Sequence, residues 1–283
     1  MQTSNKHIFI VTYDYPPSNG GIARLCFELK KYLEKKGLNV TVICPQSTST
    51  DAEEDNNVVR LHGRRGILEL RTLKYLRKKT VPGDIVITGN YHPEGMLSLL
   101  SNRETYILAH GAEYLAGKSF FRRCIWPTYR RFILRNASCV IANSHYTETL
   151  VKHCSPNAKT IAIPLAVDAI HFRPTCEKYK DGLLHLCSIS RLEKFKGHDF
   201  IIRTIASLPA KYKQQVRLHL GGKGKYKSAL ERMVTDLGLS DIVSFEGFID
   251  DNKLCDFYSA SHTFNLSNKL CEIPNFLHIS LTY

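Results

Sequence analysis

The sequence lacks any hydrophobic run long enough to cross a bilayer, which takes about 20 apolar residues. Near the N-terminus, the apolar run Ile8–Val11 gives way at once to Thr12, Tyr13 and Asp14. A run of this length is also too short to form the core of a signal peptide. We therefore expect a cytoplasmic chain that is neither exported by a signal peptide nor integral to a membrane.

The sequence also lacks the cysteine spacings of a metal or disulfide scaffold. Its nine cysteines are odd in number, scattered, and contain no CxxC pair. Zinc sites and disulfide frameworks usually show such pairs or an even count. We expect reduced, buried thiols and no structural metal.

Acidic residues are few relative to basic ones. The 283 residues include 39 Lys and Arg against 26 Asp and Glu, a formal net charge of +13. Gly and Pro are also sparse (17 and 11), and 43% of residues are hydrophobic, so disordered and collagen-like classes are excluded. The excess of basic residues favours an anionic partner: a nucleotide diphosphate, an anionic lipid or a nucleic acid.

The first part of the chain alternates between strand and helix patterns. Lys6–Thr12 predicts a buried strand, Gly21–Lys36 an amphipathic helix and Asn39–Cys44 a second strand. Such a βαβ unit is typical of a parallel sheet. The alternation continues with strands at 58–61, 84–88, 105–109, 139–143 and 160–163, and with helices at 66–79, 93–101, 118–135 and 145–153.

A polar break at Phe172–Asp181 separates this part from a second alternating part. There we expect strands at 183–189, 216–220, 242–246 and 262–266 and helices at 197–208, 226–237 and 251–259. The sequence predicts an α/β protein with two Rossmann-like, doubly wound domains. Their expected bounds are 1–173 and 182–267, joined by a linker at 174–181, with a tail at 268–283 in which no pattern continues.

Two loops that follow predicted strands can approach an anion. Gly20 and Gly21 stand between the first strand and the first helix, where a tight turn and a binding loop are equally good interpretations. Arg191 and Lys196 follow the first strand of the second domain, at the edge where open α/β sheets bind ligands. Two cations there suit a diphosphate, and the alternative is a solvated run of charge.

The next strand in the second domain ends in a similar way. Leu218–Gly224 places a glycine-rich turn after it, with Gly222 and Gly224 as a further candidate donor-side loop. Two loops of this kind on one sheet edge favour a phosphate site over a coincidence of charge.

Six short motifs in this order resemble those of the group 1 retaining glycosyltransferases (glycosyltransferase family 4). They are Tyr15-Pro16-Pro17 with Gly20-Gly21, His110-Gly111, Ile163–Asp168 with Phe172-Arg173-Pro174, Arg191-Leu192 with Lys196-Gly197, Gly221–Gly224, and Val243–Gly247. The resemblance spans residues 6 to about 267. It implies a GT-B fold, in which a first domain holds the acceptor and a second holds the nucleotide-sugar.

The resemblance also implies roles for single residues. Arg191 and Lys196 match the basic pair that neutralises the donor diphosphate, a task that needs no metal or other cofactor. Gly20 and Gly21 match the loop that closes near the diphosphate and the acceptor. His110 matches a catalytic position beside the transferred sugar, although a lone histidine is often structural.

Two features depart from the family pattern. Leu165-Ala166 stand where Asn-Gly is common, before Asp168, which matches a residue that shapes the connecting loop. The family's later acidic motif, two glutamates separated by seven residues, is absent. After residue 267 the only glutamate is Glu272, and Ser280 stands eight positions beyond it, where the second glutamate would be. We therefore expect a truncation or frameshift near 267–270, which would leave the second domain incomplete.

Basic and aromatic residues alternate in the segment 118–135. This mixture suits the headgroup region of an anionic membrane, and a core helix with a solvated basic face is an equally good interpretation. Pro127 is expected to divide the segment into two helical pieces. No recognised nucleic-acid motif accompanies the charge, so no nucleic-acid partner is expected. The candidate membrane contacts are Arg122, Arg123, Trp126, Arg130 and Arg131.

Three hypotheses about function follow from the resemblance. The first is a transferase that moves a sugar, with retention, from a nucleotide-sugar to a glycan or lipid-linked acceptor at the inner face of the membrane, in cell-surface polysaccharide or glycolipid synthesis. The second is a catalytically silent remnant that only binds membrane or acceptor. The third is a sugar-nucleotide epimerase of the same architecture.

Overall fold

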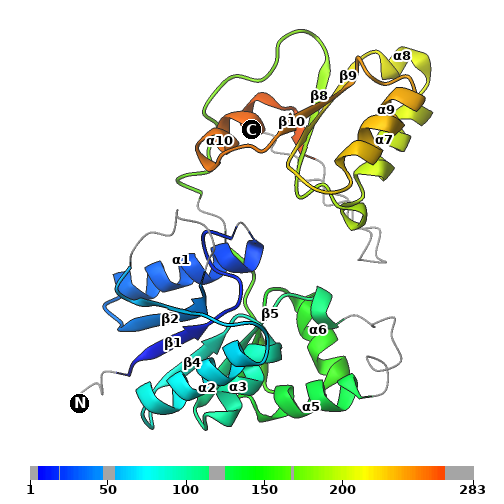
Figure 1. Cartoon of the computed structure of the whole chain (residues 1–283). Coiled ribbons are helices and arrows are strands. Elements are labelled where there is room, and N and C mark those ends of the chain that lie inside the picture. The colour runs from blue at the N-terminus through cyan, green and yellow to red at the C-terminus, as the bar shows by residue number, and fades with distance from the viewer. Residues whose placement is uncertain (1–5, 19, 47–54, 115–124, 167–168, 265–283) are drawn as a thin grey trace. The chain divides into compact units, whose positions relative to one another are not determined.

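The computed structural model describes residues 6–18, 20–46, 55–114, 125–166 and 169–264 (Figure 1). The chain divides into two compact units, Met1–Leu165 and Ala166–Tyr283, here called the first and second units. Their boundary lies within the Ile163–Asp168 motif. The tail at 268–283 and the expected truncation point lie outside the described residues.

The first unit is built on a seven-stranded parallel sheet in the order β3-β2-β1-β4-β5-β6-β7. Ile8 of β1 pairs with Val40 of β2 on one side and with Ile85 of β4 on the other. The predicted parallel sheet is therefore confirmed. Its strands are β1 (Ile8–Val11), β2 (Val40–Pro45), β3 (Val58–Leu61), β4 (Ile85–Thr88), β5 (Glu104–Ala109), β6 (Cys139–Ala142) and β7 (Thr160–Ala162).

Helices cover both faces of this sheet, because alternate residues of each buried strand face opposite sides. Ile10 of β1 packs with Cys26 of α1 on one face, and Val11 packs with Leu76 of α2 on the other. This arrangement is the doubly wound fold that the alternation predicted. The helices are α1 (Gly21–Lys35), α2 (Ile67–Lys79), α3 (Met96–Leu100), α5 (Trp126–Asn136) and α6 (His145–Cys154), with short turns η1 (Tyr91–Gly95) and η2 (Ala112–Tyr114).

The second unit repeats the plan on a smaller scale, with four parallel strands in the order β10-β9-β8-β11. Helices α7 and α9 pack on one face through Ile202, Leu218 and Leu230, and α10 lies on the other side (Figure 1). The strands are β8 (Leu184–Ile189), β9 (Val216–Gly221), β10 (Val243–Gly247) and β11 (Thr263–Phe264). The helices are α7 (His198–Ser207), α8 (Ala210–Lys213), α9 (Lys227–Asp236) and α10 (Asp251–Ala260), with a short turn η3 (Lys194–Lys196).

One helix prediction needs correction, and another is covered only in part by the described residues. Pro127 lies in the first turn of α5, where a missing N–H leaves no hydrogen bond unmade, so the described helix begins beside the proline. The piece expected before it falls on residues 118–124, which lie outside the described residues. The helix expected over 93–101 begins only at Met96, because His92 has an extended backbone with φ −140° and the chain turns through η1 first.

Each of the seven described cysteines is a free thiol. Four are buried as expected, Cys139 and Cys154 are half-buried, and Cys176 is exposed because it lies in the polar stretch 172–181. Within the described segments, no helix combines the length and the apolar character that a membrane span requires.

Candidate functional site

The candidate residues of the first unit gather where β1, β4 and β5 end. These three strands are neighbours and parallel, so their carboxyl ends share one edge of the sheet. The loop Tyr13–Gly20 follows β1, Gly89–Glu94 follows β4, and His110–Glu113 follows β5. We call this set of loops the first-unit edge.

The two glycines of the Tyr13–Gly20 loop and helix α1 differ in what requires them. A Cβ on Gly20 would lie 2.1 Å from Oδ2 of Asp14, so a larger residue there would force the Asp14 side chain to shift. A Cβ on Gly21 would meet nothing within 4 Å. Gly20 therefore lets the loop fold tightly, whereas Gly21 leaves open space at the N-terminus of α1.

His110 is held in one orientation by its neighbours. Its Nε2 lies 2.8 Å from the carbonyl oxygen of Gly89, and its backbone N–H donates to Oε1 of Glu113 at 2.7 Å. Because a carbonyl can only accept, Nε2 carries the proton. Nδ1 then has a lone pair and no hydrogen-bond partner among the described residues, which suits it to accept from a hydroxyl group.

Glu94 also belongs to this edge, and sequence reasoning missed it. Its side chain is buried, Oε1 accepts from the backbone N–H of Tyr13 at 3.1 Å, and Oε2 has no partner within the described structure. Burial raises the pKa of Glu94 to about 7, the hydrogen bond from Tyr13 opposes this, and the charges of Asp14 and Glu69 add to it. In the sequence, Glu94 falls inside the helix predicted over 93–101, so no local signal singled it out.

The second-unit edge carries Arg191 and Lys196 after β8. Arg191 is exposed and Lys196 is half-buried, and neither forms a salt bridge within the described residues. Burial lowers the pKa of Lys196, and the nearby charge of Arg191 lowers it further. Two cations that repel each other without a bound anion are well placed to receive one.

The glycines after β9 hold the loop that carries Arg191. A Cβ on Gly222 would lie 1.9 Å from the carbonyl oxygen of Ser190, and one on Gly224 would lie 2.2 Å from that of Leu192. Leu192 N–H donates to the Lys223 carbonyl at 2.9 Å. The loop after β8 that carries Arg191 and the glycine-rich loop after β9 are therefore in backbone contact. The glycines allow this close packing and so support the loop that carries the cations.

His198, which sequence reasoning also missed, lies under this loop at the start of α7. Its Nε2 is 2.9 Å from the hydroxyl of Ser190, next to Arg191. Burial lowers the pKa of His198, and the charge of Lys196 lowers it further. A neutral histidine thus fixes the residue that precedes the first cation.

The other predicted site residues lie apart or outside the description. Asp168, Arg122 and Arg123 are not among the described residues. Trp126 donates from Nε1 to the hydroxyl of Tyr91 at 2.7 Å, so its ring is fixed within the first unit.

The remaining two candidate membrane contacts differ in environment. Arg130 donates from Nη1 to the carbonyl oxygens of Glu113 (3.3 Å) and Tyr114 (3.2 Å), which ties it to η2. Arg131 is exposed on α5.

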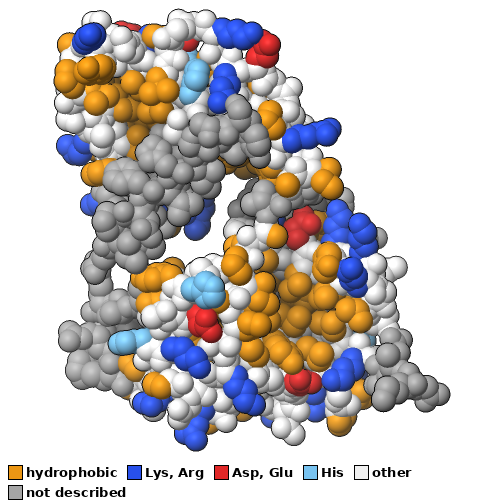
Figure 2. All heavy atoms as spheres, turned by 180° about the vertical axis from the view of Figure 1, so that it is seen from behind, with side chains coloured by type: hydrophobic (Ala, Val, Ile, Leu, Met, Phe, Trp, Pro, Cys, Tyr) orange, Lys and Arg blue, Asp and Glu red, His pale blue; other side chains and the backbone are white. Residues whose placement is uncertain are grey.

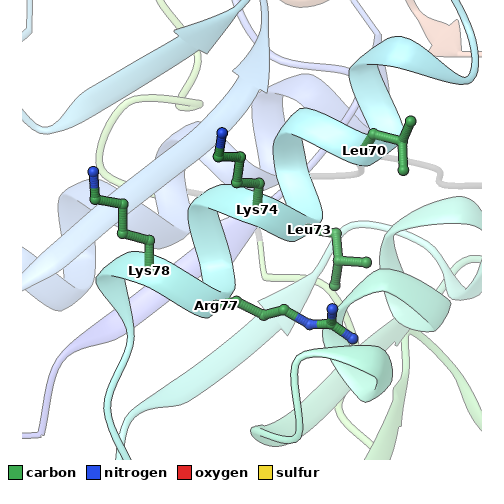
Figure 3. A pocket seen from close by; sticks show the side chains of 5 residues that line it. All are labelled: Leu70, Leu73, Lys74, Arg77 and Lys78. Carbon is green, nitrogen blue, oxygen red and sulfur yellow. The ribbon is translucent and has the colours of Figure 1, made fainter.

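A surface hollow runs along α2 of the first unit (Figure 3). Lys74 and Lys78 point to one side of the helix, and Arg77 reaches α3, where it donates to the carbonyl of Leu100. The carboxyl end of α2 leads into the amino end of β4, so the hollow lies toward the amino ends of the strands. The hollow is lined by Leu70, Leu73, Lys74, Arg77 and Lys78.

No group of three His, Cys, Asp or Glu side chains in the described part of the chain is arranged to hold a metal ion. Each unit therefore carries its own candidate edge: one with acids and a histidine in the first unit, and one with cations in the second.

Two family models match successive parts of the chain, and the gap between them lies close to the boundary of the two units. A family model of Glycosyltransferase Family 4 matches residues 19–170, and one of Glycosyl transferases group 1 matches residues 177–272. The chain belongs to the family 4, group 1 glycosyltransferases.

Curated relatives are distant. A GDP-mannose-dependent alpha-(1-6)-phosphatidylinositol monomannoside mannosyltransferase of Mycobacterium tuberculosis is 24% identical, over 91% of this chain and 71% of the relative. An alpha-monoglucosyldiacylglycerol synthase of Streptococcus pneumoniae is 23% identical, over 91% of this chain and 65% of that protein.

Solved structures share the fold. A sucrose-phosphate synthase from Thermosynechococcus elongatus has a TM-score of 0.74 at 20% identity, over 93% of this chain and 76% of that one. Anabaena HepE in complex with UDP has a TM-score of 0.60 at 19% identity, over 93% and 74%. These likenesses establish the GT-B arrangement of two Rossmann-like units that the sequence predicted.

The close approach at Gly222 predicts a local loss of stability on adding a methyl group. Gly222 (φ +129°) faces the Ser190 carbonyl, whereas Gly238 (φ +64°) has nothing within 4 Å of a Cβ. Gly222→Ala should therefore lower the free energy of unfolding by about 2 kcal/mol more than Gly238→Ala, as measured by urea denaturation. Equal losses would show that the two loops do not touch.

The burial of Glu94 predicts a pH-dependent stability difference. With a pKa of about 7 when folded and an ordinary value near 4.5, the folded chain keeps a proton that the unfolded chain loses. Stability from this group is therefore full below pH 4.5 and falls as pH rises to 7. Glu94→Gln, which cannot ionise, should be stabilised relative to the wild type at pH 8 by about 1–3 kcal/mol more than at pH 4.5.

Thermal and urea unfolding at the two pH values measure this difference. The exposed Glu28→Gln on α1 is the matched control and should show the same small effect at both pH values. The same effect of Glu94→Gln at pH 4.5 and 8 would contradict the assignment.

Proposed function

We propose that the chain transfers a sugar from a nucleotide-sugar to a glycan or lipid-linked acceptor, with retention of configuration. The observation that carries the proposal is the pair Arg191 and Lys196, which form no salt bridge among the described residues and are supported by the glycine loop at the carboxyl edge of the second sheet. Family membership and the fold support the same class of reaction.

The donor diphosphate is the natural anion for this pair. As the bond between the anomeric carbon and the phosphate oxygen breaks, negative charge grows on the departing nucleoside diphosphate. Arg191 and Lys196 would stabilise that charge without a metal, and His198 and Ser190 would keep the loop in position. The basic pair therefore acts on the leaving group rather than on the acceptor.

The acceptor is assigned to the first-unit edge. His110 presents an unprotonated Nδ1 there, which can accept a hydrogen bond from a sugar hydroxyl. The acceptor oxygen would form the new bond to the anomeric carbon, and its proton would leave with the diphosphate. The anomeric configuration of the product tests retention directly.

The relatives suggest the substrate class. Two of them are named for mannosyl or glucosyl transfer in glycolipid synthesis, and HepE has been solved with UDP and with UDP-glucose. By analogy with these proteins, we propose a GDP- or UDP-hexose as the donor and a glycolipid or polysaccharide as the acceptor.

We also propose that the chain contacts the inner face of an anionic membrane, because a glycolipid acceptor would lie in such a membrane. Figure 2 shows one face of the first unit, on which hydrophobic side chains have Lys and Arg side chains beside them. Helices α2 and α5, which Figure 2 does not label, carry the same combination. Leu70 of α2 is 69% exposed beside Lys74 and Lys78, and Phe132 of α5 is 53% exposed beside Arg131. Basic residues next to exposed apolar ones favour a lipid headgroup surface.

Donor binding predicts the effect of removing the cations. Arg191→Ala and Lys196→Ala should each lower kcat/KM for sugar transfer by about a hundredfold or more, because each removes a charge opposite the leaving group. The assay offers radiolabelled UDP-glucose, UDP-galactose and GDP-mannose to lipid-linked and free glycan acceptors. Lys211→Ala on α8, an exposed lysine, is the control and should retain full activity.

Other outcomes of this assay separate the alternatives. Transfer should survive EDTA if the cations replace a metal. Failure of every donor to bind in calorimetry would favour the remnant that only binds membrane or acceptor. An isomerised nucleotide-sugar formed without acceptor would favour the epimerase.

Membrane contact predicts a charge-dependent association with vesicles. Changing Arg122, Arg123, Arg131 and Lys74 to Glu should reduce flotation with anionic vesicles by about tenfold or more, at about 1 kcal/mol per basic residue. Arg130 is kept because it donates to backbone carbonyls. Lys211→Glu with Lys213→Glu is the control, and unchanged flotation of the first variant would remove the membrane proposal.

A further inference from the structure

The Tyr13–Gly20 loop is fastened to the first unit at separate points. Arg60 of the neighbouring strand β3 donates from Nη2 to the carbonyl of Pro16 at 2.9 Å. Tyr15 is only 7% exposed and packs into the core beside α1. At its beginning, the loop is held by Glu94, which accepts from the backbone N–H of Tyr13.

Glu94 is the fastening that changes charge near neutral pH. The Arg60 guanidinium keeps its charge at every accessible pH, and the contact of Tyr15 is apolar. The carboxyl of Glu94 is 4% exposed, one of its oxygens has no partner in the described structure, and its pKa is raised to about 7. The proton on this group therefore comes and goes within the physiological range.

The surroundings of Glu94 disfavour its ionised form. The titratable groups that act on it or feel its charge are Tyr13 and Asp14 of the loop, Cys26 of α1 and Glu69 of α2. None of these is a cation, and no salt bridge to Glu94 occurs among the described residues. Backbone hydrogen bonding from Glu94 itself and from Tyr13 only partly offsets the hydration that a buried carboxylate loses, so ionisation favours an arrangement in which water reaches the side chain.

Water can reach Glu94 if the segment that covers it moves. The covering segment includes Tyr13, whose amide is bonded to Oε1, and Thr12, whose hydroxyl holds Asp14 by two hydrogen bonds of 2.9 and 3.2 Å. The end of β4 is closely packed here, since a Cβ on Gly89 would lie 2.7 Å from the Thr12 hydroxyl. The Tyr13–Gly20 loop, which lies outside the strands, is the part that can lift.

We infer that Glu94 is a positioning residue: its protonated carboxyl keeps the Tyr13–Gly20 loop packed on the first-unit edge, and its ionisation releases the loop. Binding of a proton and packing of the loop are thus linked, because the group binds the proton more tightly when it is covered. The packed fraction falls as pH rises through about 7.

For catalysis, this inference rests on the proposed function. The resemblance places the same loop near the donor diphosphate and the acceptor. Release of the loop should therefore weaken substrate binding more than it slows the chemical step. KM should rise as pH increases from 6 to 8.5, by about tenfold, while kcat changes little.

The direct test follows the Tyr13 amide in the ¹⁵N-labelled full chain by NMR between pH 5.5 and 8.5. We expect the Tyr13 amide shift to titrate with a midpoint near 7, together with one ¹³C-labelled glutamate carboxyl of the wild-type chain. The titration should vanish in Glu94→Gln and persist in Glu28→Gln. An unchanging Tyr13 amide, or a titration that survives in Glu94→Gln, would overturn the inference.

Two further measurements keep the test decisive. Should Glu94→Gln fail to fold, the carboxyl titration in the wild type alone decides, because no buried glutamate titrating near pH 7 would contradict the inference. Arg60→Ala removes a second polar fastening, away from Glu94, and should leave the midpoint within about half a pH unit. A Tyr13 titration without sugar transfer would refute the proposed function only, whereas transfer without the titration would refute the role of Glu94 only.

Discussion

The common direction of the strands is the constraint on which the candidate site depends. In each sheet every described pair is parallel, so all carboxyl ends meet at one edge. Residues far apart in sequence, such as Asp14, Glu94 and His110, therefore share one edge of the first unit. Arg191 and Gly222 come together in the second unit for the same reason.

The two edges differ in charge. The first-unit edge combines a neutral histidine nitrogen with carboxyl groups, one of which keeps a proton near neutral pH because it is buried. The second-unit edge presents two cations that have no acidic partner among the described salt bridges. This division suits a hydroxyl acceptor on one unit and a diphosphate on the other, which is the chemistry of a sugar transferase.

Much of the fold could be predicted because its strands are short apolar runs between clear turns. The strand at 58–61 is found exactly as expected, and Gly21–Lys36 differs from α1 by one residue. Contacts between distant segments could not be predicted from such local patterns. Nothing local shows that Gly222 abuts the Ser190 carbonyl, or that Glu94 and His198 become buried, since burial depends on packing between distant segments. A helix boundary beside Pro127 was foreseeable, because a proline is disfavoured within a helix but accepted in its first turn.

The central claim is that the second-unit edge binds a diphosphate, and calorimetry with a series of nucleotides tests it most directly. The full chain would be titrated with uridine, UMP and UDP, and with guanosine, GMP and GDP. The account predicts that, in one series, the diphosphate binds about tenfold or more tightly than the monophosphate, with an affinity that falls as salt rises. Equal affinities for nucleoside, monophosphate and diphosphate in both series would contradict it.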